Sequence, residues 1–181
     1  MPHRGGAAIE GAQTRFRRVR RGNEARIPRM SLDAIDRRIL AIYQSAVRTP
    51  AELIGDRVGL SAAAVQRRLK RMRDEGLVAA ETAQLDCRRL GLGLTAIVHV
   101  DLQDETARAT KAFRDKILRH AEVQQCYGVT GEADFVLVVI VADMAAYEAF
   151  CEKVFLHDAN VRSFRTQVVL DAVKRYGPLT L

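Results

Sequence analysis

The sequence has little of what disulfide-rich, metal-binding or membrane-spanning proteins need. Only three of its 181 residues are cysteines, and no two of them form a Cys-x-x-Cys pair. A disulfide framework or a zinc ribbon is therefore not expected, and a reducing compartment fits. The longest apolar run, residues 135–142, has the length of a strand, which argues against a membrane-spanning helix. The first residues carry arginines with no apolar stretch behind them, so no secretory signal is expected.

Signatures of catalysis are also missing from the sequence. There is no phosphate-binding G-x-x-x-x-G-K-[ST] loop, no G-x-G-x-x-G and no G-x-S-x-G elbow. The four histidines show no metal-ligand spacing to one another or to cysteine. A Cys126/His99 pair on neighbouring strands is conceivable, but a cysteine on a strand is far more often a packing residue. We expect that the chain is not an enzyme and that it needs no cofactor.

The net charge of +7 is unevenly distributed along the chain. Residues 1–30 carry eight arginines against two glutamates, and residues 31–80 carry nine basic against six acidic residues. Residues 81–181 carry twelve basic and fourteen acidic residues, so the basic character belongs to the first 80 residues. This asymmetry predicts that the N-terminal part meets a polyanion and that the rest has another task.

Residues 1–30 show no sustained hydrophobic period and contain the arginine-rich stretch 15–21. They are predicted to be a disordered basic extension. Three interpretations remain open: an arm that binds DNA phosphates or a minor groove, an inert solvated tail, or a segment that precedes a true start at Met30.

Residues 31–80 are predicted to form a helix-turn-helix domain of three short helices. Asp33 is the expected N-cap of the first helix. The second helix is expected to open with a capping box at residues 49–52 and to end near residue 58. Gly59 supplies a sharp turn, and Ser61 is placed to cap a third helix that reaches about Glu75.

The third helix has one apolar face and one face suited to a DNA groove. Val65, Leu69 and Met72 follow the i, i+4, i+7 spacing of a core-facing stripe. Short or polar side chains that are expected to meet base edges lie opposite this stripe, at Ala63, Gln66, Arg67 and Lys70. Four further residues are expected to hold phosphates, at Ser61, Arg68, Arg71 and Arg73.

Residues 94–176 are predicted to form a second, ferredoxin-like βαββαβ domain, so the fold class is α+β. Strands are expected at 94–102, 122–130, 135–141 and 161–173, and helices at 104–120 and after Asp143. Residues 81–93 are expected to be a strand and linker between the domains, and residues 177–181 a tail. Apolar side chains that another subunit should cover are expected on the face of the sheet without helices, at Ile97, Val129, Val168 and Leu170.

In both predicted domains, ordered stretches of the chain resemble the Lrp/AsnC (feast/famine) family of transcription regulators. In the first domain they are LDAIDRRIL at 32–40, VGLS at 58–61, VQRRLKRM at 65–72 and EGLV at 75–78. In the second domain they are CYGVTGEADF at 126–135 and RTQVVL at 165–170. The resemblance covers about residues 31–176 and leaves the first 30 residues unexplained.

The resemblance implies an effector site in the loop between the second and third strands of the second domain. It also implies homodimers that form through that domain and assemble further into tetramers or octamers, with an amino acid as the common effector. The implied effector-binding residues are Val129, Thr130, Gly131, Glu132, Ala133 and Asp134, with Thr166 from the last strand. Such a loop suits a zwitterion, because glycine lets the backbone approach a ligand and a carboxylate can pair with an ammonium group.

These observations predict a sequence-specific DNA-binding transcriptional regulator of the Lrp/AsnC type. Its partners would be double-stranded DNA and a small metabolite, most often an amino acid, that modulates DNA binding or assembly. We expect a cytoplasmic, nucleoid-associated protein with no membrane contact. The alternatives are a sequence-tolerant DNA-architectural protein and an amino-acid-binding module with no role on DNA.

Overall fold

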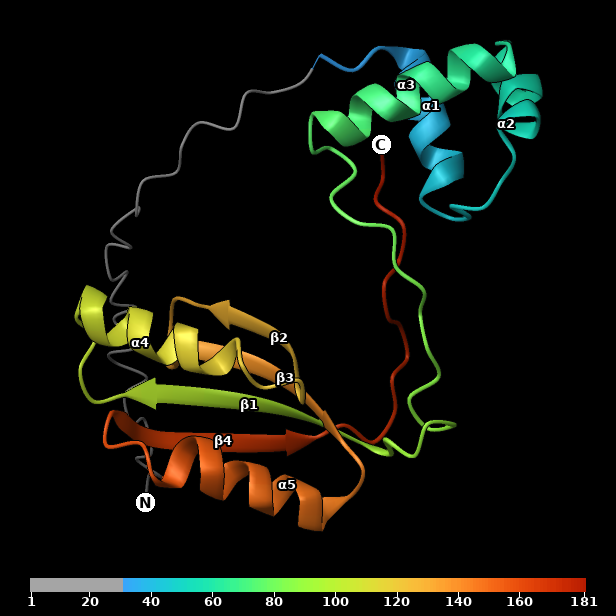
Figure 1. The fold of residues 1–181 in the computed structure, drawn as a ribbon. Coiled ribbons are helices and arrows are strands. Elements are labelled where there is room, and N and C mark those ends of the chain that lie inside the picture. The colour runs from blue at the N-terminus through green and yellow to red at the C-terminus, as the bar shows by residue number, and fades with distance from the viewer. Residues whose placement is uncertain (1–30) are drawn as a thin grey trace, which may run out of the picture. The chain divides into compact units, whose positions relative to one another are not determined.

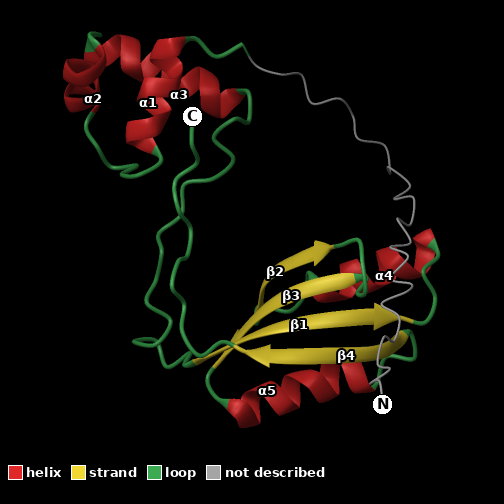
Figure 2. Ribbon diagram, turned by 180° about the vertical axis from the view of Figure 1, so that it is seen from behind, coloured by secondary structure: helices red, strands yellow, loops and turns green. Residues whose placement is uncertain are grey.

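The computed structural model describes residues 31–181, so the predicted extension at residues 1–30 lies outside the described residues. The described chain forms two compact units, which are shown in Figures 1 and 2 and are treated separately below. One unit comprises residues 86–171. The other comprises residues 31–85 together with the C-terminal residues 172–181.

The helical unit is built from α1 (Ala34–Tyr43), α2 (Ala51–Val58) and α3 (Ala62–Asp74). Each helix turns one apolar stripe inward, which is the pattern that burial of a shared core requires. The core consists of side chains from all three helices, at Ile39, Leu40, Tyr43, Ile54, Val58, Val65, Leu69 and Met72. The three-helix arrangement predicted from the sequence is therefore confirmed.

The ends of these helices follow local sequence signals in most cases. The Asp33 carboxylate accepts from the Asp36 backbone N–H at 2.7 Å, and the Asp36 side chain accepts in return from the Asp33 N–H at 3.3 Å. The Ser61 hydroxyl accepts from the Ala64 N–H, and Gly59 adopts φ 76° at the end of α2. These three predictions are confirmed.

The capping box predicted at residues 49–52 is wrong. Pro50 is the N-cap of α2 and makes no side-chain cap hydrogen bond, while the Thr49 hydroxyl donates to the Ala46 carbonyl at 2.8 Å. The helix therefore begins one residue later than expected, and Glu52 lies one position too early to complete a capping box.

The second unit is an antiparallel sheet with strand order β2-β3-β1-β4. Its elements are β1 (Leu94–Leu102), α4 (Ala107–Ile117), β2 (Val123–Gly128), β3 (Phe135–Val141), α5 (Met144–Cys151) with the π-helical turn η1 (Glu152–Leu156), and β4 (Val161–Val168). The βαββαβ order confirms the predicted ferredoxin-like arrangement. Both helices pack on the same face of the sheet, as Figure 2 shows. Phe113 of α4 and Phe150 of α5 share one core with β1 and β3.

The other face of the sheet, here called the open face, carries no helix from residues 31–181. Along β1, buried residues alternate with half-buried ones, and the half-buried Ile97 and His99 lie opposite Val138 and Val136 of β3. Val168 was expected on this face but lies opposite the buried Ala96, so its side chain belongs to the helix-covered face.

Two predicted strand segments are absent from the structure. Residues 79–93 contain no strand, and β4 ends at Val168 instead of residue 173. A strand needs a continuous ladder of hydrogen bonds to a neighbour. The Val169 N–H donates to the Thr95 carbonyl, but neither segment is a strand of the described sheet. The helix predicted at 104–120 is also shorter, because the Thr106 hydroxyl caps α4 at its start and the last turn unwinds after Ile117.

None of the helices within residues 31–181 is both long enough and apolar enough to cross a bilayer. The same described residues contain no group of three or more histidine, cysteine or acidic side chains that could hold a metal ion.

Candidate functional site

The exposed face of α3 carries the polar side chains that were predicted to meet base edges. Ala63, Gln66, Arg67 and Lys70 are all exposed. Lys70 pairs with Asp74 at 2.6 Å, but both side chains are more than half exposed, and such pairs are weak in water. The structure gives Arg67 no hydrogen-bonding or ion-pair partner among residues 31–181. The face therefore presents donors that an incoming ligand can engage.

Two arginines of α3 attach the helix to the start of α1. Arg68 donates to Asp33 at 2.6 Å and to Asp36 at 2.7 Å, and Arg71 donates to Asp36 at 2.6 Å. Asp36 is 1% exposed and is the one charged residue in the described chain that is fully buried. A buried carboxylate needs such partners, because leaving it unpaired costs several kcal/mol. The pairs therefore fix the position of α3 against α1.

The charges at this junction shift the pKa of their partners in the directions that ion pairing requires. The backbone N–H of Asp36 and the Arg68 guanidinium lower the pKa of Asp33. In return, hydrogen bonds to Asp33 and Asp36 raise the pKa of Arg68 above its ordinary value. Both groups are thus held in their charged forms.

Arg73 is also engaged inside the helical unit. It donates to Glu81 at 2.6 Å and to the Tyr43 hydroxyl at 2.5 Å, and its guanidinium lies 5.4 Å from the centre of the Tyr43 ring. Three of the four residues predicted to hold phosphates, Arg68, Arg71 and Arg73, are thus ion-paired rather than free. Sequence reasoning missed this because the acidic partners of Arg68 and Arg71 lie more than 30 residues away on another helix.

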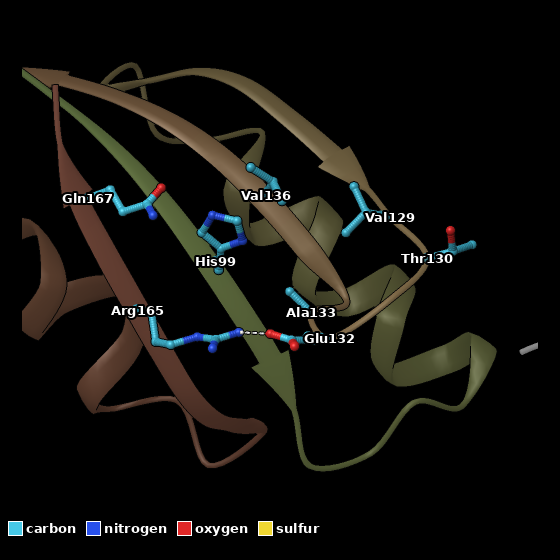
Figure 3. Close-up of a pocket in the computed structure, with 8 residues that line it drawn as sticks. All are labelled: His99, Val129, Thr130, Glu132, Ala133, Val136, Arg165 and Gln167. Carbon is cyan, nitrogen blue, oxygen red and sulfur yellow. Dashed lines mark hydrogen bonds and ion pairs between the residues drawn. The ribbon is translucent and has the colours of Figure 1, made fainter. Parts of the chain in front are cut away.

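A hollow of about 450 Å³ lies on the open face of the C-terminal unit (Figure 3). It is lined by side chains from β1, β3, β4 and the β2–β3 loop, at His99, Val129, Thr130, Glu132, Ala133, Val136, Arg165 and Gln167. Figure 3 shows the Arg165 guanidinium reaching across β1 towards Glu132, to which it donates at 3.2 Å. Both side chains are more than half exposed.

The chemistry of the hollow combines charges of both signs with an apolar wall. The Arg165 guanidinium can hold a carboxylate in a fork of two hydrogen bonds, and the Glu132 carboxylate can accept from an ammonium group. Val129, Ala133 and Val136 supply apolar surface beside these charges. A small zwitterion with an apolar part matches this lining.

The structure gathers part of the predicted effector site and leaves two residues outside it. Val129, Thr130, Glu132 and Ala133 line the hollow, and Gly131 makes the turn between them at φ 126°. The Asp134 carboxylate instead accepts from the Leu102 N–H at 2.8 Å, and so ties the loop to the end of β1.

Thr166 lies on the helix-covered face of the sheet, where its hydroxyl is 2.5 Å from the Tyr147 hydroxyl. Its neighbours Arg165 and Gln167 line the hollow on the open face, because successive side chains of a strand point to opposite faces of the sheet. Phe164 is half-buried and packs against the core. Counting alternate residues from this aromatic side chain would have placed Arg165 and Gln167 on the opposite face. His99 and Val136 were missed as site residues because only strand pairing brings them beside the loop.

Replacing Asp134 with asparagine tests the structural role of this carboxylate. The amide keeps the size of the side chain but weakens the charge-assisted bond to the Leu102 N–H, so we expect the free energy of unfolding to fall by about 1 kcal/mol. Urea denaturation followed by circular dichroism measures the loss. Glu132→Gln is the matched control on the same loop, and a loss as large in Glu132→Gln would contradict the assigned role of Asp134.

A helix-turn-helix unit with an exposed polar third helix, joined to a ferredoxin-like unit that bears a hollow, defines a class of protein: the transcription regulator with a separate ligand-binding domain. The comparisons with known proteins agree with this class. Residues 32–73 match the AsnC-type helix-turn-helix domain, and residues 95–179 match the Lrp/AsnC ligand binding domain. The chain belongs to the Lrp/AsnC family and is a transcriptional regulator of that type.

Several relatives are similar over most of their length. An HTH-type transcriptional regulator of Sinorhizobium fredii is 39% identical over 145 residues, which cover 80% of this chain and 86% of the relative. The leucine-responsive regulatory protein of Klebsiella pneumoniae is 30% identical over 85% of this chain and 94% of its own. A transcriptional regulator of Neisseria meningitidis, solved in complex with L-Met, superposes with a TM-score of 0.78 at 30% identity, over 83% of this chain and 97% of that structure.

Proposed function

We propose that α3 enters the major groove of duplex DNA and reads base edges with Ala63, Gln66, Arg67 and Lys70. The observation that supports this is the exposed polar face of α3, whose Arg67 has no partner among the described residues. A glutamine can pair with adenine through two hydrogen bonds, and an arginine can do the same with guanine. The short side chain of Ala63 lets the start of the helix approach the groove floor closely.

The residues that hold α3 in place can also serve as phosphate contacts. A guanidinium has five N–H donors, and the pairs described above use only some of them. The side chains of Arg71 and Arg73 are each 44% exposed, which leaves donors free to meet a phosphate. We therefore propose that phosphates of the DNA backbone are contacted by Ser61, Arg68, Arg71 and Arg73. These contacts would set the position of α3 on the duplex, while Gln66 and Arg67 discriminate between bases.

The hollow on the open face is the proposed effector site, and its ligand class is an amino acid. Arg165 would hold the carboxylate of the ligand, Glu132 its ammonium group, and the wall at Val129 and Val136 its side chain. The complex of the Neisseria meningitidis regulator with L-Met supports this ligand class. In this assignment residues 31–80 bind DNA, and residues 94–171 of the sheet unit bind the effector and assemble subunits.

The open face is also the proposed surface of homodimer formation. Half-buried apolar side chains stand on it without cover from any described residue, at Ile97, Val136, Val138 and Ile140. A two-fold dimer would offer two copies of α3 to successive major grooves, and further assembly would give tetramers or octamers. The effector would change DNA binding only by favouring one assembly, on a scale of about 1–3 kcal/mol. A regulator of this kind acts in the cytoplasm, at the nucleoid.

Arg67→Ala tests the DNA-binding proposal. Loss of one bidentate base contact is expected to weaken binding to the specific site by about 10- to 100-fold, while weak binding to random duplex changes little. Gel shifts at rising salt, with the DNA upstream of the protein's own gene, measure both affinities. Arg162→Ala, an exposed arginine of the other unit, is the matched control.

Equal affinity of wild type and Arg67→Ala for the specific site would contradict base reading by α3. Equal affinity of the wild type for specific and random duplex would favour a sequence-tolerant architectural protein instead.

Arg165→Ala tests the effector proposal. The variant is expected to lose the heat of binding that the wild type gives with at least one of the twenty amino acids in isothermal titration, because the ligand carboxylate loses its charged partner. Arg162→Ala on the same strand should titrate like the wild type. Retention of the full heat by Arg165→Ala would place the effector elsewhere.

A further inference from the structure

The last turn of α1 holds two chain segments that come from opposite ends of the C-terminal unit. One is the connector at residues 79–85, which leads from α3 towards β1. The other is the C-terminal segment at residues 172–181, which follows β4. The two anchoring side chains, Tyr43 and Gln44, are adjacent in the sequence.

The connector is attached through Glu81. Its carboxylate accepts from the Tyr43 hydroxyl at 2.7 Å and from Arg73 at 2.6 Å. These two hydrogen bonds lower the pKa of Glu81, so the carboxylate stays charged and bound near neutral pH. Val78, just before the connector, packs against the core of the helical unit. The start of the connector is thus part of the helical unit.

The C-terminal segment is attached through Gln44. The amide of this side chain donates to the Leu179 carbonyl at 2.8 Å and accepts from the Leu179 N–H at 2.9 Å. A side chain that satisfies both backbone groups of one residue mimics the pairing of a neighbouring strand. The sequence separation of 135 makes this a long-range contact that local chain stiffness does not explain.

The strand ends to which the two segments connect also lie side by side on the sheet. Ala96 of β1 lies opposite Val168 of β4, and the Val169 N–H donates to the Thr95 carbonyl at 2.9 Å. The match to the ligand-binding domain extends to residue 179, although residues 172–179 pack with the helical unit. Within residues 31–181, the chain therefore passes between the two units at two places, residues 85–86 and residues 171–172.

We propose that residues 172–181 are a strap that forms a second tether between the two units, with Gln44 as its positioning residue. One tether lets a domain swing about a single connection, whereas a second tether reduces that freedom. The strap limits the positions that the helix-turn-helix unit can take relative to the sheet, which is the degree of freedom that a ligand-dependent change would have to act on. This inference does not depend on the identity of the DNA site or of the effector.

Hydrogen exchange of the full chain tests the attachment directly. In Gln44→Ala, the amides of residues 172–181 are expected to exchange about tenfold faster than in the wild type, because the two bonds that close the strap are lost. Gln44→Glu should be intermediate, since a carboxylate still accepts from the Leu179 N–H but cannot donate to its carbonyl. Ser45→Ala, the next residue along, is the matched control. Equal exchange in Gln44→Ala and wild type would overturn the proposal.

Pulsed electron spin resonance tests the tether itself. Spin labels at Glu52 of α2 and Glu148 of α5, both exposed, report the spread of distances between the units when Cys87 and Cys126 are replaced by serine. Labelled chains diluted with unlabelled ones isolate the distance within one subunit. Gln44→Ala is expected to broaden the distribution and Ser45→Ala to leave it unchanged. An unbroadened distribution in Gln44→Ala would show that the segment binds α1 without restraining the units, which also overturns the proposal.

Discussion

Replacing Gly55 with alanine is expected to lower the free energy of unfolding of the helical unit by about 3 kcal/mol. A Cβ atom at this position would lie 2.3 Å from the Leu60 carbonyl oxygen, far inside van der Waals contact. The neighbour is backbone and cannot rotate away, because the Gly59 and Leu60 N–H groups both donate to the Gly55 carbonyl, at 2.8 and 3.0 Å. The turn between α2 and α3 would have to open, and α3 would move with it.

Urea denaturation followed at 222 nm measures the stability loss in Gly55→Ala, and the gel shift measures its consequence for DNA. The matched control is Gly59→Asn, where φ is 76° but nothing lies within 4 Å of an added Cβ. Asparagine tolerates this left-handed conformation, so the control should lose less than about 1 kcal/mol. Full stability in Gly55→Ala would mean that the two helices do not pack as closely as described.

Asp36→Ala is expected to destabilise the helical unit by a similar amount, about 3 kcal/mol. The substitution removes the shared partner of Arg68 and Arg71 and one half of the capping box with Asp33. Both arginines are partly exposed and can regain water, so the loss stays below that of a fully buried pair. Because these pairs fix α3 against α1, DNA affinity should fall as well.

The contribution of the Asp36 charge to the free energy of unfolding can be separated from that of the side chain's shape. Asp36→Asn keeps the side-chain volume and an acceptor for the arginines but removes the negative charge, so it should lie between wild type and Asp36→Ala. Asp56→Ala, an exposed carboxylate on α2, is the control for a simple change in net charge. Denaturation midpoints that are the same for Asp36→Ala and Asp56→Ala would refute the anchoring role of Asp36.

The elements with strong local signals could be predicted from the sequence. Asp33, Ser61 and Gly59 mark helix ends through bonds or backbone angles that involve only three or four consecutive residues, and all three behave as expected. The continuous apolar run of β3 predicted a buried central strand, and β3 is paired on both sides. The overall α+β class followed from the order of such elements.

One local signal failed, the capping box at residues 49–52. The other errors arose where the outcome depends on residues far apart in the chain. The partners of Arg68 and Arg73 come from other elements of the fold, and no spacing rule within α3 reveals them. Asp134 looked like a ligand group in the sequence, but the end of β1 supplies a backbone N–H that occupies it. Thr166 was placed one residue out of phase with the sheet, because strand alternation is set by pairing with β1.

Mapping the bound DNA across the genome, for the wild type and for a Gln66→Ala/Arg67→Ala variant, tests the central claim most directly. If α3 reads bases, the wild type should occupy a limited set of discrete sites that share a two-fold symmetric pattern, and the variant should lose them while the folded protein persists. Unchanged occupancy in the variant, or no enriched sites in the wild type, would contradict the account of α3 as the sequence-reading element.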